Sequence, residues 1–224
     1  MDPEAAQLVL SGILVIGAVV WLTGLQFLVR ASRAVTPERD QDMYPDSQSP
    51  SAPNRLTGYA EVQGQPGVLA TRAASILAKG SPLGPIKIVE KTDDRLAFER
   101  LGPGMANQPA SRWFRRGELR FSTARQSRCR VEWTAELANM DWLLKLGALF
   151  QVLGLLALGI GGWAIDTYVV SSPEPAVRWQ TVQIMQAVHF LWPPFLFGAL
   201  YRRGRKEVAA HFEALAHNLP YYES

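Results

Sequence analysis

The sequence predicts an α+β membrane protein with three transmembrane helices and one small domain, an antiparallel sheet with a helix, inserted after the first of them. Three runs contain no charged residue, at 5–29, 146–165 and 179–201. Each run is long enough for a helix to cross about 30 Å of hydrocarbon, which takes about 20 residues. Between the first two runs, apolar residues alternate with polar ones, a pattern typical of strands with one buried face.

The N-terminal segment, residues 1–30, is predicted to be a transmembrane helix that is retained as an anchor. The chain begins Met1-Asp2-Pro3-Glu4, whereas a secretory signal begins with basic residues, and the apolar run exceeds the roughly 7–15 residues of a signal core. Arg30 and Arg33 follow the run directly. Because basic residues favour the inner side, we expect the N-terminus outside and the next domain in the cytoplasm.

Residues 31–56 are predicted to form a flexible linker. The segment is rich in proline, serine, aspartate and glutamine, and it has almost no aliphatic side chain between 36 and 54. Such a composition buries too little apolar surface to order itself.

The cytoplasmic α+β domain is predicted at 57–141. A strand at 59–63 precedes a helix at 67–79, which Gly80 and Pro82 stop. Two hairpins follow, with strands at 86–90 and 95–100 and then around 118–121 and 128–135, separated by a loop at 102–112. The helix should cover the buried face of the sheet. This order of elements is similar to that of several small α+β lipid-binding and interaction modules, but no motif indicates one family.

Residues 142–201 are predicted to form a transmembrane helical hairpin, with helices at about 143–168 and 179–201. The loop at 171–175 is short and contains two prolines, which favours antiparallel neighbours. Of the 23 lysines and arginines, 18 lie between 30 and 145 and four between 202 and 206, which leaves Arg178 alone outside. This distribution predicts a multi-pass protein of the plasma (inner) membrane with its C-terminus in the cytoplasm.

A basic amphipathic helix is predicted in the C-terminal segment, 202–224. Val208, Phe212, Leu215 and Leu219 recur at spacings of four, three and four, which places them on one helical face. This face could lie on lipid headgroups or dock onto the cytoplasmic domain.

The sequence gives no sign of an enzyme. We find no nucleophile elbow, no phosphate-binding glycine loop and no HExxH or CxxC metal spacing. The lone Cys129 is interpreted as a small core residue. We therefore expect no catalytic residue, no metal site, no small-molecule substrate and no nucleic acid.

The leading hypothesis is a non-catalytic accessory or scaffolding subunit of a larger membrane complex, which packs through its transmembrane helices. Glycines at intervals of seven in the second span allow close approach of helices, and glutamines of the third span need polar partners in lipid. Two prolines should kink or break the third span. The predicted packing or partner-contact residues are Gly147, Gly154, Gly161, Gln183, Gln186, Trp192, Pro193 and Pro194.

A second hypothesis is a membrane-tethered module that binds lipid or another hydrophobic ligand. A dense cluster of arginines could contact anionic headgroups beside the membrane. The competing interpretations are solvated strand faces and, least favoured, nucleic acid, since a net charge of +3 is modest and no recognition motif accompanies it. The predicted lipid contacts are Arg112, Arg115, Arg116, Arg120, Arg128 and Arg130.

A third hypothesis is a haem- or pigment-binding subunit. His189, within the third apolar run, could ligate haem or a chlorophyll-type pigment through a ring nitrogen. A hydrogen bond from His189 to a neighbouring helix competes with this interpretation. We therefore predict no cofactor apart from that possibility.

Overall fold

The computed structural model describes residues 3–33, 54–81, 83–102, 109–124, 127–138, 140–164, 167 and 189–222. The chain divides into two compact units. The helical unit contains the described residues of 1–34 and 142–201, and the sheet unit contains those of 35–141 and 202–224.

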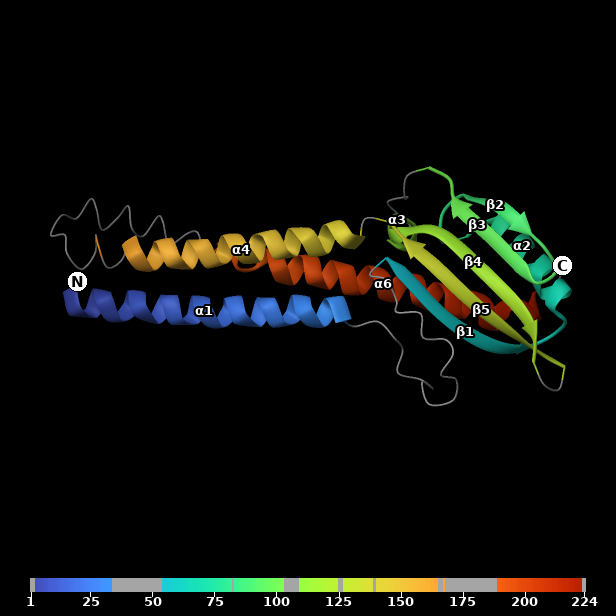
Figure 1. The fold of residues 1–224 in the computed structure, drawn as a ribbon, viewed down its shortest axis with the longest axis horizontal. Helices are drawn as coiled ribbons and strands as arrows, with labels where there is room; N and C mark the ends of the chain where they lie inside the picture. Colours follow the sequence, from blue (N-terminus) through green and yellow to red (C-terminus); the bar gives the residue numbers. More distant parts are fainter. Residues whose placement is uncertain are drawn as a thin grey trace. The chain divides into compact units, whose positions relative to one another are not determined.

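In the helical unit, α1 (Pro3–Arg33) packs with α4 (Met140–Ala164) and with residues 193–201 of α6 (Pro193–Asn218) (Figure 1). Small residues line the contacts at intervals of seven on both long helices. Gly17, Gly24 and Ala31 of α1 are buried, as are the three glycines of α4 at 147, 154 and 161. The small size of these residues lets the helices approach closely.

Two helical segments, Ser11–Ser32 and Met140–Trp163, are long and apolar enough to cross a membrane. Most of their apolar side chains are exposed, for example Ile16, Leu155 and Ile160. The core helix of a soluble protein is mostly covered instead. Of the third apolar run, at 179–201, the structure describes only residues 189–201. Hence two candidate spans are observed, and the three-span topology stays a prediction.

The sheet unit contains a five-stranded antiparallel sheet in the order β1-β5-β4-β3-β2, so the first strand pairs with the last. Between β1 and β2 lies α2 (Pro66–Lys79), and between β3 and β4 lies the short α3 (Pro109–Trp113). The strands are β1 (Arg55–Gln63), β2 (Ile86–Lys91), β3 (Arg95–Arg100), β4 (Phe114–Thr123) and β5 (Arg128–Leu137).

One face of the sheet is covered by α2 and by residues 202–218 of α6. The side chain of Phe212 lies 5.9 Å from Phe98, 5.8 Å from Phe114 and 5.2 Å from Trp133, measured between ring centroids. Gly117 of β4 makes room for this cluster, since an added Cβ would lie 2.5 Å from Phe98 and 2.9 Å from Phe212. The predicted apolar stripe Val208, Phe212, Leu215 and Leu219 is buried, so this helix docks onto the sheet.

Several predicted boundaries differ from the structure. Residues up to Arg33 belong to α1 and β1 begins at Arg55, so both elements extend by a few residues into the segment predicted as a linker at 31–56. The loop at 102–112 contains α3, which begins at Pro109. The C-terminal helix is also not a separate element, because α6 runs without interruption from Pro193 to Asn218. The sequence pattern did not predict one continuous helix, because the uncharged run ends at 201 and an amphipathic pattern with basic residues begins at 202.

Candidate interaction surface

The face of the sheet opposite α2 and α6 is polar, and we call it the open face. Every second residue along a strand points to it. Along its strands, arginines and glutamates occur in equal numbers. The arginines are Arg55, Arg95, Arg116, Arg120, Arg128 and Arg130, and the glutamates are Glu61, Glu90, Glu99, Glu118, Glu132 and Glu136.

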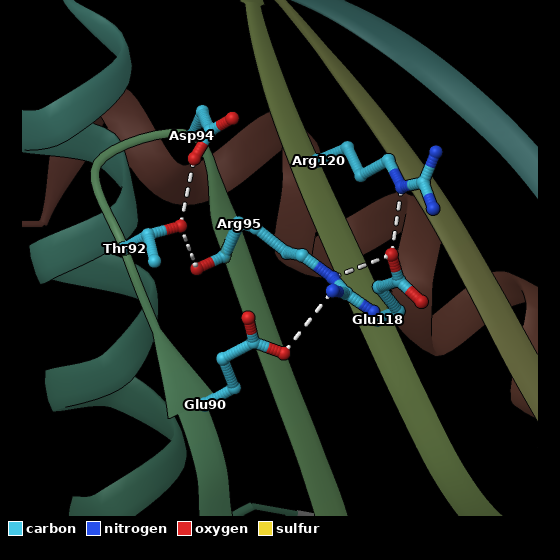
Figure 2. A network of polar contacts seen from close by, with 6 residues as sticks. All are labelled: Glu90, Thr92, Asp94, Arg95, Glu118 and Arg120. Carbon is cyan, nitrogen blue, oxygen red and sulfur yellow. Dashed lines mark hydrogen bonds and ion pairs between the residues drawn. The ribbon is translucent and has the colours of Figure 1, made fainter.

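Glu118 of β4 joins three strands of this face. Its Oε1 atom accepts hydrogen bonds from Arg95 Nε at 2.9 Å and from Arg120 Nε at 2.7 Å. Arg95 Nη1 also lies 3.1 Å from Glu90 Oε2 on β2. Figure 2 shows the Arg95 side chain between these two carboxylates, with Arg120 on the far side of Glu118. Burial alone would raise the pKa of Glu118, but the hydrogen bonds and charges of both arginines outweigh this and lower the pKa.

The turn between β2 and β3 holds Arg95 in place. The Thr92 hydroxyl donates to Asp94 Oδ1 at 2.7 Å and lies 3.3 Å from the Arg95 carbonyl oxygen (Figure 2). The Thr92 amide donates to the same carbonyl at 2.8 Å. The Asp94 carbonyl in turn accepts from the Phe121 amide at 2.7 Å. These bonds fix the backbone from which the Arg95 side chain extends.

A second polar cluster consists of Arg130 and Glu132 of β5 with Tyr59 of β1. Arg130 Nε lies 2.9 Å from Glu132 Oε1, and the Arg130 guanidinium sits 4.6 Å from the centroid of the Tyr59 ring. Tyr59 is 39% exposed, so one large aromatic ring lies at the surface of a charged face. Cation–π contact and ion pairing together orient the guanidinium.

The six arginines predicted to contact lipid lie in two groups along the sheet unit. Arg120, Arg128 and Arg130 lie on the open face among glutamates. Arg112 lies in α3 and Arg115 in the irregular start of β4, and Arg116 next to it begins the open face, opposite Glu136. The sequence could not separate the two groups, because both lie within one run of the chain.

The predicted helix-packing glycines contact helices of the same chain. A Cβ at Gly147 would lie 2.7 Å from Leu28 Cδ2, and a Cβ at Gly154 would lie 3.0 Å from Leu191 and 3.3 Å from Trp21. Gly161 is buried. Gly147 and Gly154 therefore allow close packing between helices within the helical unit.

The proline pair lies at the start of α6. Residues 189–190 form a 3-10 turn, residues 191 and 192 bend, and α6 begins at Pro193. Pro193 and Pro194 are buried in the first turn, where the missing amide hydrogen costs no helical bond, and Trp192 is exposed. A kink or break of the third span at these prolines stays a prediction, since the residues before 189 lie outside the described ones. Gln183 and Gln186 lie outside the described residues.

His189 is exposed and has a polar or ring contact in the structure. Among the described residues, no group of three His, Cys, Asp or Glu side chains is placed to hold a metal ion. His211 and His217 lie on α6 in the sheet unit, and burial lowers the pKa of His211. Ligation of a haem or pigment by His189 stays a prediction.

Sequence reasoning missed two polar residues that organise the fold. Glu118 interrupts a run of arginines, and that interruption was the available signal. Gln151 is an amide in an otherwise apolar span, and such a residue needs a polar partner in lipid.

No protein-family model, curated protein or solved structure matches this chain.

Proposed function

We propose that the protein is a non-catalytic, membrane-anchored accessory subunit that binds a partner protein through the open face of its sheet. The helical unit anchors the chain, and the sheet unit lies on the cytoplasmic side, as the distribution of basic residues predicts. The observation that carries this proposal is the ordered array of arginines and glutamates around Glu118, with Tyr59 beside it.

Folding stability does not explain this array. Exposed ion pairs contribute at most about 1 kcal/mol each, because water screens them and long side chains lose entropy. For recognition the same geometry is useful, since side chains that are already oriented lose less entropy on binding. Arginine and tyrosine are also the residues that often dominate binding energy in interfaces.

The other surfaces are less suited to a partner. Glycines of α1 and α4 are used in contacts within the chain. On the covered face of the sheet, the rings of Phe98, Phe114 and Phe212 fill the space that a hydrophobic ligand would need. The open face is therefore the surface we assign to a partner protein.

The test is affinity purification of the tagged full-length protein in mild detergent, with mass spectrometry of co-purifying chains. Arg120→Glu reverses one charge on the open face, where the Arg120 side chain is 65% exposed. Lys79→Glu makes the same change on α2, on the covered side of the sheet. We expect a stoichiometric partner with wild type and Lys79→Glu and its loss with Arg120→Glu. A protein that purifies alone, or a partner retained by both variants, contradicts the proposal.

A further inference from the structure

A second charged region lies at one end of the sheet unit and includes the end of the open face. The unit is connected to the helical unit between residues 34 and 35, between 141 and 142 and between 201 and 202. Exposed basic residues gather at this end from three segments far apart in the sequence. We call them the basic end: Arg55, Arg112, Arg115, Arg116, Arg202 and Lys206.

Contacts within the sheet unit bring these segments together. Arg205 of α6 donates from Nη2 to the Arg55 carbonyl at 3.3 Å. A Cβ at Gly204 would lie 2.5 Å from Met140 Cε and 2.9 Å from Trp113 Cγ, so α6 lies directly on α3. Arg202 and Lys206 flank Gly204 and Arg205 on α6, and Arg112 precedes Trp113 on α3. These contacts therefore place all three basic residues at the same end of the sheet unit as Arg55.

Main-chain pairing adds the start of β4 to this end. Arg116 and Arg55 are both Cα partners of Glu136, one on each side of β5. The Ala138 amide donates to the Trp113 carbonyl at 2.6 Å, and the Leu137 amide donates to the Asn54 carbonyl at 2.7 Å. Figure 1 shows α3, the start of β4 and the start of β1 at one end of the sheet.

The balance of charge differs from that of the open face as a whole. Among the described residues, the carboxylates that main-chain pairing and hydrogen bonds place beside the six cations of the basic end are Glu99, Glu136 and Asp141. Glu99 lies opposite Lys87 as well as Arg116, and Asp141 accepts a hydrogen bond from the neutral Asn54 amide at 2.6 Å. The six cations therefore outnumber these carboxylates, whereas arginines and glutamates are balanced on the open face.

We propose that the basic end binds the anionic headgroups of membrane lipids. This inference rests on the membrane anchoring in the proposed function, because covalent connection holds Arg202 and Lys206 within a few positions of the apolar helices. The contacts described above bring Arg55 and the segment 112–116 to the same part of α6. Clusters of four to eight basic residues beside a transmembrane helix are attracted to acidic lipids. Several separated cations suit a layer of headgroups better than one compact anion, because each can contact a different phosphate.

The experiment uses the full-length protein in mild detergent, titrated with dioleoyl phosphatidylglycerol or with dioleoyl phosphatidylcholine, and native mass spectrometry counts bound lipids. Two triple variants remove the same charge. One carries Arg112→Gln, Arg115→Gln and Arg116→Gln, and the matched control carries Arg120→Gln, Arg128→Gln and Arg130→Gln. Each basic residue near the membrane surface contributes about fivefold to the affinity for an acidic lipid. The variant at positions 112, 115 and 116 should therefore bind phosphatidylglycerol roughly a hundredfold more weakly than wild type at low salt. The control should stay within about twofold of wild type, because its arginines lie farther along β4 and β5 from the basic end.

Equal losses in both variants would indicate net charge alone and would overturn the proposal, and so would no loss in the first. Arg202→Gln with Lys206→Gln tests the same end from α6 if the α3 variant does not fold. Inorganic phosphate that displaces the lipid completely would assign the site to free phosphate and contradict a headgroup site. If no partner protein is found, the proposed partner binding fails, but the lipid affinities measured here still test the basic end. If alkaline carbonate releases the chain from membranes, the protein is not anchored, and both proposals fail.

Discussion

Trp21 and Gln151 bind each other's main chains across two helices of the helical unit. The Trp21 indole donates to the Gln151 carbonyl at 2.7 Å, and the Gln151 side-chain amide donates to the Trp21 carbonyl at 2.6 Å. Gln151 is 5% exposed and packs beside Gly24. This reciprocal pair fixes the register of α1 against α4, since a shift of either helix breaks both bonds.

Gln151→Leu is expected to destabilise the helical unit by about 0.5–2 kcal/mol, which is the range of hydrogen bonds between membrane helices. Leucine has a similar volume, so the loss should come from the bond and not from a cavity. Unfolding by dodecyl sulfate in mixed micelles measures the change. The control Gln26→Leu alters an exposed glutamine of α1 and should be neutral or stabilising. Equal effects from both substitutions would show that the pair does not set the register.

Gly154→Leu should separate the helices, whereas Gly159→Leu should not. An added Cβ at Gly154 would lie 3.0 Å from Leu191 and 3.6 Å from the Phe190 carbonyl, but at Gly159 it would meet no atom within 4 Å. Overpacking of this kind costs about 1–3 kcal/mol. The same unfolding assay compares the two variants, and similar stabilities would refute the packing of α4 described above.

Phe212→Ala should destabilise the sheet unit by about 3–5 kcal/mol, because its ring is fully buried against Phe98, Phe114 and Trp133. Tyr221→Ala, at a side chain 83% exposed, is the control and should change stability by less than about 0.5 kcal/mol. Near-ultraviolet circular dichroism during thermal unfolding follows the aromatic cluster. A small effect of Phe212→Ala would mean that α6 does not cover the sheet.

Glu118 should make stability depend on pH in the acidic range. Its pKa is lowered in the folded state, so its contribution is complete above the unfolded pKa of about 4.3 and is lost as pH falls through the folded pKa. The gap in unfolding free energy between wild type and Glu118→Gln should then shrink between about pH 5 and pH 3, by no more than about 1 kcal/mol. Thermal unfolding at both pH values measures the gap. A constant gap would exclude an ionised, paired Glu118.

The elements of the sheet unit could be predicted because each follows a local rule. The helix at 67–79 is observed as α2 at Pro66–Lys79, and the hairpin strands differ from prediction by a few residues. Alternation of apolar residues along β5, from Cys129 to Leu137, gave the buried face directly. Strand β1 was predicted too short, because Leu56 and Ala60 are separated by Gly58, which interrupts the pattern although Trp133 packs over it.

The candidate surface could not be predicted because it depends on cross-strand neighbours. The sequence places Arg120 in a basic run, but only the register shows that Arg95, Glu118 and Arg120 meet. Likewise, Arg55 and Arg116 are far apart in the chain and share Glu136 across β5. Long-range pairing of this kind leaves no periodic signal.

Site-specific photo-crosslinking tests the central claim most directly. A photoreactive phenylalanine analogue replaces Thr57 on the open face or, as the matched control, Thr71 on α2, both exposed threonines. Full-length protein in its native membrane is irradiated, and adducts are identified by mass spectrometry. We predict one abundant protein adduct from position 57 and none from position 71. Equal adducts from both positions, or none from position 57, would contradict a partner on the open face.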